Sequence, residues 1–398
     1  MKKKYKKLIR KLILLLIIVG IGLGSYKLYK HFNNDSDSSA FKITQSKDNK
    51  VKETWPKVEK VSLIAGGDTV VHDQVAAFAK KSDDTYDFNP YFTEIKDMIS
   101  SYDIAYYNQE TTLGGKELGY TFYPMFNTPT EFGQAMVNTG FNMVSLANNH
   151  SYDRGEKAVI NSVNFWNSQD DVMTNGMALS DDERTNYQIM TKNGISYAML
   201  SYTYGLNGFK LPNGKDYLVN VYSNELVKKD IEAIRDKVDV LIVAMHWGVE
   251  YTHNPTNTQK TQAKYLASLG VDVIIGNHPH CIQPVEWIDN TLVIYSLGNL
   301  ISNQVILVPK YGQKVAIGAF ATMDFIKTTN EDGTKNIKID NLEIELSYTY
   351  KNSAEKYYKV IPFSKMNTKY LSNYEEVYNE FKNVIQKFDN NIKVKPSA

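Results

Sequence analysis

The chain has 398 residues but only one cysteine, Cys281, so no intramolecular disulfide can form and the fold depends on its hydrophobic core. Three familiar signatures are also missing: a Walker A loop, a Gly-x-Ser-x-Gly nucleophile elbow and a Cys-x-x-Cys pair. The sequence therefore gives no indication of a P-loop protein, an elbow-type serine hydrolase or a dithiol enzyme. With 42% hydrophobic and 22% charged residues, its composition is that of an ordinary globular protein.

Beyond residue 30 the chain also lacks an excess of positive charge. Residues 1–30 carry nine basic side chains and no acidic one, which leaves 36 basic against 44 acidic residues, a formal net charge of −8, in the remainder. Nucleic-acid binders owe much of their affinity to lysine and arginine on phosphates. The composition therefore argues against a nucleic-acid partner, and any contact with an anionic polymer must be local or metal-mediated.

The basic N-terminal residues precede an apolar run at residues 12–23. Flanking lysines can snorkel, which extends the usable length toward the roughly 20 residues that a bilayer requires. A cleaved signal peptide has similar anatomy, but no convincing A-x-A-like site follows the run. We expect a cytoplasmic flank (1–11), a transmembrane signal anchor (12–30) and an extracellular linker (31–57), which would place the remaining chain outside the cell membrane.

Polar residues follow several buried strand-like runs. Continuous apolar runs such as 241–245 and 271–275 indicate strands covered on both faces, and the helical stretches between them indicate an α/β fold. The ends of such runs carry Asp68, Glu110, Asn149, His150, His246, His278 and His280. Ligands collect at the carboxyl ends of strands in such sheets. Carboxylates, an amide oxygen and imidazoles together form a mixed set that Zn, Mn or Fe accepts. The sequence therefore predicts a divalent-metal site.

Several of these residues also have ordinary alternative roles. Asp68 alone is equally well explained as a turn residue, and a single histidine such as His150 as the first residue of a helix. Trp247 and Glu250 can line a substrate pocket, but core packing and a solvent salt bridge explain them as well. Asn299 is a candidate for the site or for a turn. Recurrence at successive strand ends is what favours a shared site.

Six sequence blocks occur in order: GGD, NQE, ANNHSYDRG, HWGVEY, GNHPHCIQPVE and YSLGN. Together they resemble the capsule-synthesis protein CapA family, also called the poly-γ-glutamate synthesis protein PgsA family, which in turn resembles the calcineurin-like metallophosphatases. The resemblance implies a four-layer α/β/β/α sandwich over about residues 58–327, with strands and a helix appended at 328–398. It also implies a cell-surface role in making, exporting or anchoring an anionic polymer such as poly-γ-glutamate, with membrane partners of a polymer synthase complex.

The resemblance also implies roles for individual residues. The metal ligands would be Asp68, Glu110, Asn149, His246, His278 and His280, and the catalytic pair would be His150 and Asp153. Beside them, the positions suggested for substrate binding are Asn108, Trp247, Glu250 and Asn299. One departure concerns the first block, which is Asp-x-His in the superfamily but Asp68-Thr69-Val70 here. One imidazole is therefore missing unless His72 turns inward, so one ion and two ions both stay open.

Three functions remain open from the sequence. The first is an accessory protein of capsule assembly that binds or processes polymer. The second is an extracellular metal-dependent phosphoesterase that acts on envelope phosphodiesters such as teichoic-acid linkages. The third is a purely structural protein with a degenerate site. The long glycine- and tyrosine-rich stretch at residues 202–217 is a predicted substrate lid.

Overall fold

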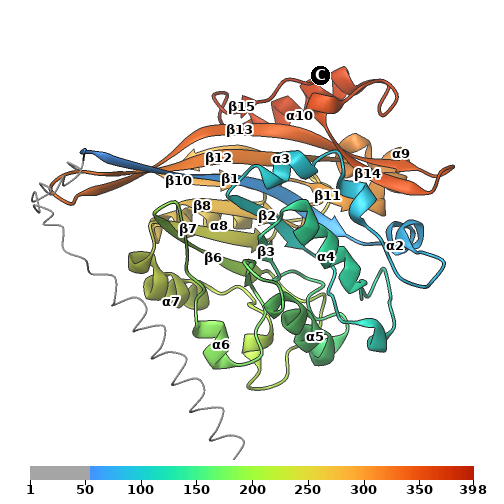
Figure 1. Cartoon of the computed structure of the whole chain (residues 1–398), viewed down its shortest axis with the longest axis horizontal. Helices are drawn as coiled ribbons and strands as arrows, with labels where there is room; N and C mark the ends of the chain where they lie inside the picture. The colour runs from blue at the N-terminus through green and yellow to red at the C-terminus, as the bar shows by residue number, and fades with distance from the viewer. Residues whose placement is uncertain (1–53) are drawn as a thin grey trace, which may run out of the picture. The chain divides into compact units, whose positions relative to one another are not determined.

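Two β-sheets lie face to face in the computed structural model, which describes residues 54–398 (Figure 1). The expected transmembrane anchor at residues 12–30 and nearly all of the expected linker lie outside these described residues. Within them, no helix combines the length and the apolar character that a membrane span requires.

The larger sheet has nine strands, and its main path is β14-β13-β12-β1-β2-β3-β4, with β11 beside β1 and β15 beside β13. Strands β1 to β4 and β11 run parallel, whereas β12, β13 and β14 are antiparallel additions. The strand bounds are β1 (Lys57–Val70), β2 (Ile104–Gln109), β3 (Met143–Ser145), β4 (Met173–Asn175), β11 (Asn299–Ser302), β12 (Ile317–Thr329), β13 (Lys335–Asn352), β14 (Tyr357–Pro362) and β15 (Lys393–Val394).

The smaller sheet has six strands in the order β5-β6-β7-β8-β10-β9. Its central strands β6, β7, β8 and β10 are parallel, and the two edge strands are antiparallel to their neighbours. The strand bounds are β5 (Met190–Lys192), β6 (Ile195–Thr203), β7 (Val240–His246), β8 (Val273–Asn277), β9 (Val285–Ile288) and β10 (Thr291–Ile294). Mainly parallel strands with helices between them confirm the predicted α/β fold.

Alternation of side chains along the strands builds three hydrophobic layers. Leu63 of β1 and Ile242 of β7 belong to the core between the sheets, whereas Ile64 and Val243 point to the opposite faces, where helices cover them. The structure therefore has the layer order helix, sheet, sheet, helix. The helix bounds are α2 (Asp73–Ala79), α3 (Lys96–Ser100), α4 (Thr130–Thr139), α5 (Gly155–Asn167), α6 (Asp181–Thr185), α7 (Asn224–Ile234), α8 (Asn257–Ser268), α9 (Val308–Tyr311) and α10 (Tyr374–Ile385).

Local sequence signals explain where the helices of the smaller sheet begin. The Ser223 side chain accepts a hydrogen bond from the Leu226 N–H at 3.1 Å and caps α7. Thr256 and Gln259 form a capping box at the start of α8. By contrast, the helical pattern of residues 89–101 does not give one continuous helix, because the segment forms a short 3-10 turn (Asn89–Phe92) and then α3. Burial of its aromatic and aliphatic side chains in the same core overrides the helical pattern.

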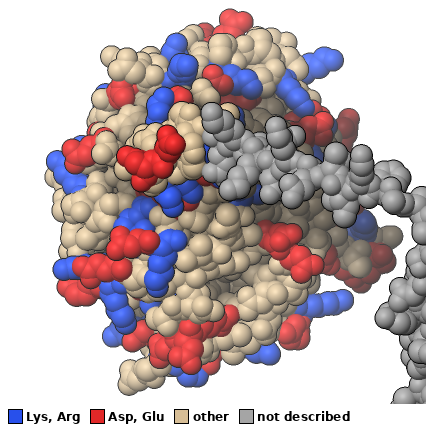
Figure 2. Space-filling model, turned by 60° about the vertical axis from the view of Figure 1, so that its left-hand side comes forward, with Lys and Arg blue, Asp and Glu red and all other residues tan. Residues whose placement is uncertain are grey.

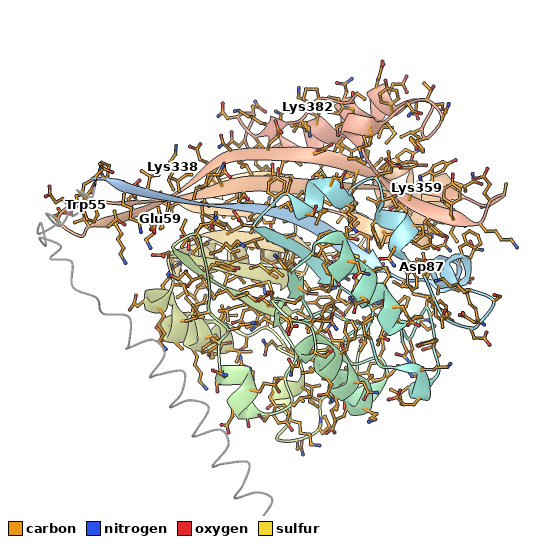
Figure 3. All side chains as sticks on the ribbon, in the orientation of Figure 1. Trp55, Glu59, Asp87, Lys338, Lys359 and Lys382 are labelled. Atoms are coloured by element: carbon orange, nitrogen blue, oxygen red, sulfur yellow. The ribbon has the colours of Figure 1, made fainter. Side chains whose placement is uncertain are left out.

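Residues 328–398 continue the larger sheet rather than forming a separate body. The long hairpin of β12 and β13 extends the sheet beyond β1, and β14 and β15 pair with β13. Helix α10 packs Val377, Phe381 and Ile385 against this extension, while Lys382 on the same helix points outward (Figure 3). The C-terminal strands thus share a core with β1, whose far end carries Asp68.

Candidate metal centre

The parallel strands deliver the predicted site residues to one edge of both sheets. Asp68 lies near the end of β1, opposite the end marked by Trp55 and Glu59 in Figure 3, and Glu110 directly follows β2. His246 is the last residue of β7, and His278 directly follows β8. Because parallel strands end at the same edge, residues far apart in the sequence meet there.

A glycine lets β1 approach its neighbour at this edge. A Cβ atom on Gly67 would lie 1.9 Å from the Gly298 carbonyl oxygen, so no larger residue fits there without a backbone shift. The next residue, Asp68, donates its backbone N–H to the same oxygen at 2.9 Å. The GGD block therefore places the Asp68 carboxylate by close backbone packing.

Two groups of potential ligands share one residue. Asp68, Glu110 and His246 form one group, and Glu110, His278 and His280 form the other. Within each group the ligand atoms lie within 4.8 Å of one another, and every member is buried. The arrangement suits a divalent metal site, because mixed carboxylate and imidazole ligands are what such ions accept.

Glu110 carries the strongest indication of a bound cation. Its carboxylate is fully buried, and neither oxygen has a hydrogen-bond partner among the described residues. Oε1 lies 3.7 Å from His246 Nε2 and 3.4 Å from His280 Nε2. Burial raises the pKa of Glu110 well above its usual range, which a positive charge at the centre would reverse. Orphaned oxygens beside imidazole nitrogens are the environment of a metal ligand, so these residues fit a divalent ion.

The imidazoles of His246 and His278 are suited to ligation. Their ring centroids are 4.8 Å apart, and His278 Nδ1 is buried without a partner in the described chain. Burial lowers the pKa of His246 well below its usual value and that of His278 to about 3, which favours the neutral imidazole that binds metal ions. His278 has φ +94° and His280 φ +54°, a region that non-glycine residues rarely adopt and that often occurs at functional sites.

Asp68 and His280 are held by buried polar neighbours. Asp68 Oδ1 accepts from Asn108 Nδ2 at 2.9 Å, and Oδ2 accepts from the His278 backbone N–H at 2.9 Å. His280 Nδ1 lies 3.1 Å from Asn299 Oδ1, and donation there leaves Nε2 facing Glu110. Burial alone would lower the pKa of His280, but the negative charges of Glu110 and Asp68 raise it above its usual value. Asn108 and Asn299 thus contact the centre through its ligands.

Asn149, His150 and Asp153 lie where the centre opens to solvent. Asn149 Oδ1 is 2.8 Å from His246 Nε2, and His150 Nδ1 is 2.7 Å from Asp153 Oδ2. Asn207, from the stretch predicted as a lid, contacts both Asn149 (3.1 Å) and His150 (3.3 Å). These four residues and the exposed Glu250 line a cavity of about 280 Å³. The side chains next to the centre therefore border a space that a small molecule can enter.

Two candidates do not lie at this centre. Trp247 is buried in the core between the smaller sheet and its helices, where its indole N–H donates to the Tyr295 carbonyl oxygen at 3.0 Å. The substrate-binding assignment of Trp247 is therefore wrong, because adjacent residues of an extended chain point to opposite faces and His246 takes the inner one. His72 belongs to neither ligand group. Its Nδ1 lies 3.0 Å from the carbonyl oxygen of Val70, two residues earlier in the chain.

The structure adds two residues to the centre that the sequence analysis did not single out. Asn277 is buried next to His278, and its Oδ1 has no partner within the described chain. Its place in the GNHPH block, at the end of a strand, was a usable signal. Tyr204 packs its ring against His278, with centroids 4.8 Å apart, and parallel to His246. Nothing in its glycine-rich surroundings pointed to this contact.

The fold and centre define an α/β protein with a buried cluster of potential metal ligands at one end of two facing sheets. The model of the family described as bacterial capsule synthesis protein PGA_cap matches residues 62–304, so the chain belongs to this family, as its sequence blocks predicted. It is 28% identical over 186 residues to the PGA biosynthesis protein CapA of Bacillus subtilis, covering 44% of this chain and 47% of that protein. It is also 28% identical over 176 residues (43% and 42%) to the capsule biosynthesis protein CapA of Bacillus anthracis. The chain thus spans less than half the length of these relatives.

Solved structures show only distant likeness. A hypothetical protein from Thermus thermophilus has a TM-score of 0.41 and 14% identity, with 70% of this chain and 98% of that one covered. A putative 5'-nucleotidase from Staphylococcus aureus has a TM-score of 0.39 and 13% identity, with 72% and 54% covered. Both scores are below 0.5, so these likenesses support no inference about this chain.

Proposed function

We propose that this chain is a membrane-anchored cell-surface protein that takes part in the synthesis, export or anchoring of an anionic capsule polymer of the poly-γ-glutamate type. Membership of the capsule synthesis family supports the proposed role in making a capsule polymer. The observation that carries the metal-dependent part is the fully buried, unpaired Glu110 carboxylate within 4 Å of two imidazoles. A buried, unpaired carboxylate costs folding free energy, and a bound cation removes most of that cost.

The proposed ligands are Asp68, Glu110, Asn149, His246, His278 and His280, and the ion or ions are Mn, Zn or Fe. When bound, a divalent ion polarises a substrate oxygen and lowers the pKa of water. The chain's own contribution is at the rim. Asp153 Oδ2 holds the His150 ring through Nδ1 and also accepts the Phe126 backbone N–H at 2.8 Å. The other ring nitrogen, Nε2, is thereby positioned to donate a proton to a substrate oxygen.

Contact with an anionic polymer is proposed to be local. On the face seen in Figure 2, lysine and arginine side chains alternate with aspartate and glutamate, and no broad basic patch forms among the described residues. The cavity beside His150 is bordered by Glu250 and contains no basic side chain apart from that histidine. The centre itself is therefore proposed to take one group of the polymer rather than a long anionic stretch.

A metal-dependent phosphoesterase acting on envelope phosphodiesters is the second candidate. The oriented His150–Asp153 pair and the cavity of about 280 Å³ beside the ligand cluster favour it, as does the resemblance of the sequence blocks to calcineurin-like metallophosphatases. The absence of an imidazole at Val70 weakens the first ion position and tilts the balance toward capsule assembly.

Surface polymer and phosphodiester hydrolysis test the proposal together. In a capsule-forming host that lacks this chain, we expect the parent sequence to restore polymer and the His246→Ala/His278→Ala variant to fail. The matched control is His253→Ala. His253 is also poorly accessible, but it forms no hydrogen bond with a site residue. Its Nδ1 lies 2.6 Å from the Ile282 carbonyl oxygen. Polymer restored by a metal-free double variant would contradict the proposal. Metal-dependent hydrolysis of bis-p-nitrophenyl phosphate without any polymer effect would favour the phosphoesterase.

The proposed anchor has its own test. If residues 12–30 hold the chain in the membrane with its body outside, the intact chain should fractionate with membranes and resist alkaline carbonate extraction. Protease added to whole cells should then degrade the body. Replacing Leu14 and Ile17 by lysine should release the chain from the membrane fraction, whereas a cleaved, soluble parent chain would contradict the anchor.

A further inference from the structure

A second cavity lies away from the metal centre, beside the edge strand β4 and the helices α5 and α6. Its volume is about 350 Å³, within the range of small-molecule sites. It shares no lining residue with the cavity beside His150. Six of its lining side chains carry the argument: Trp166, Asn167, Asn175, Asn186, Tyr187 and Gln188.

The charged side chains of this cavity already have hydrogen-bond partners. Its charged lining residues are Glu183 and Arg184. Arg184 donates from both terminal nitrogens to the buried Asp230, at 3.2 and 2.5 Å, and from Nε to Asn220 at 2.9 Å. Glu183 accepts from the Leu179 N–H at 2.6 Å and from Asn167 at 3.0 Å. No unpaired positive charge remains among these lining residues to hold an anion, so an anionic ligand does not match this cavity.

Two amides at the mouth of the cavity keep unused donors or acceptors, and one buried donor of the lining is unpaired. The indole of Trp166 is 1% exposed, and its N–H has no partner within the described chain, a state that buried donors rarely keep. The Asn186 side chain makes no hydrogen bond within residues 54–398, and Gln188 uses only its oxygen, for the Thr174 N–H at 3.3 Å. Amides both donate and accept, as hydroxyl groups do.

The walls of the cavity are held in place before any ligand arrives. The half-buried Tyr187 donates its hydroxyl to Asp230 at 2.7 Å, which fixes the ring that borders the cavity. Asn220 bonds to the Ser201 carbonyl oxygen at 3.2 Å. A Cβ on Gly176 would lie 2.3 Å from the Ala147 nitrogen, so this wall packs directly behind the loop that carries Asn149. A rigid site loses little entropy on binding.

We propose that this cavity binds a neutral, hydroxyl-rich ligand, namely a mono- or disaccharide unit. The sugar hydroxyls would bond to the amides of Asn186 and Gln188, and the apolar face of the ring would pack on Tyr187. The absence of an unpaired positive charge among the lining residues selects neutral sugars over sugar acids. This site is independent of the proposed metal-dependent function.

Ligand-observed NMR and calorimetry on the whole metal-loaded chain test the site, with glucose, galactose and N-acetylglucosamine as probes and glucuronate as the charged comparison. We expect saturable binding of at least one neutral probe and weaker binding of glucuronate. Asn186→Ala/Gln188→Ala, two positions at the cavity mouth, should weaken binding at least about tenfold, a loss that calorimetry resolves.

Two controls separate this site from the rest of the molecule. Gln134→Ala/Asn138→Ala removes a pair of exposed amides, 3.1 Å apart on α4, and should leave saccharide binding unchanged. His246→Ala should lose metal yet keep saccharide binding. No saturable binding of any neutral probe, tighter binding of glucuronate, or full binding by the Asn186/Gln188 variant would overturn the proposal.

Discussion

Glu110→Gln is expected to remove metal from the centre and to weaken divalent-ion affinity by more than about 100-fold. This loss exceeds the roughly 10- to 100-fold that follows when a residue hydrogen-bonded to a metal ligand is removed. Glu110 belongs to both ligand groups, so no three-residue group survives without it. The amide has nearly the same volume but no charge, and its NH₂ group repels a cation where a carboxylate oxygen stood. The substitution therefore removes ligation with little change in packing.

Elemental analysis and melting temperature of the purified whole chain check this expectation. The parent should hold near-stoichiometric metal and melt at a lower temperature after chelation, because an ion that binds only the folded state stabilises it. The variant should hold none and should not respond to chelator. Glu345→Gln is the matched control, since Glu345 is also buried but bonds to Lys395 at 2.8 Å far from the cluster, so metal should remain. Full metal content in the Glu110 variant would contradict the assignment of Glu110 as a metal ligand.

The sequence could predict which residues lie at the strand ends of the centre, because the central strands are buried on both faces. Uninterrupted apolar runs mark β7 and β8 within two residues of their observed bounds, and polar residues within the next three positions lie at the sheet edge. Asp68, Glu110, His246 and His278 were found in this way. Their convergence required the parallel strand order, which the alternation of strands and helices already favoured.

Other features depended on information that hydrophobic periodicity does not carry. Trp247 is an intermediate case, because strand alternation continued one residue past β7 places its side chain on the face opposite His246, in the outer core. Asn207 is different, because it reaches His150 from an irregular loop 57 residues away, and no repeat predicts where such a loop folds. The polar cavity behind β4 likewise arises from an edge strand, two helices and a loop whose residues share no sequence pattern.

Asp230→Ala is expected to cost about 3–5 kcal/mol of unfolding free energy, the usual cost of breaking a buried charge pair from one side. Asp230 is 1% exposed on α7 and accepts from Arg184, from Tyr187 at 2.7 Å and from Tyr202 at 2.8 Å. Its loss leaves a buried guanidinium and two hydroxyls without their acceptor. Urea unfolding of the whole chain measures the effect.

Helix α7 supplies a control for this prediction, because Glu232 forms an exposed pair with Lys228 at 3.7 Å on the same helix. Glu232→Ala should change stability by less than about 0.5 kcal/mol, as exposed pairs do. If the unpaired guanidinium causes the loss, Arg184→Met combined with Asp230→Ala should be more stable than Asp230→Ala alone. A single-variant cost below about 1 kcal/mol, or no recovery in the double variant, would show that the Asp230 network does not hold α6 to α7. Because Arg184 and Tyr187 border the polar cavity, the same variant should also weaken saccharide binding while the metal stays in place.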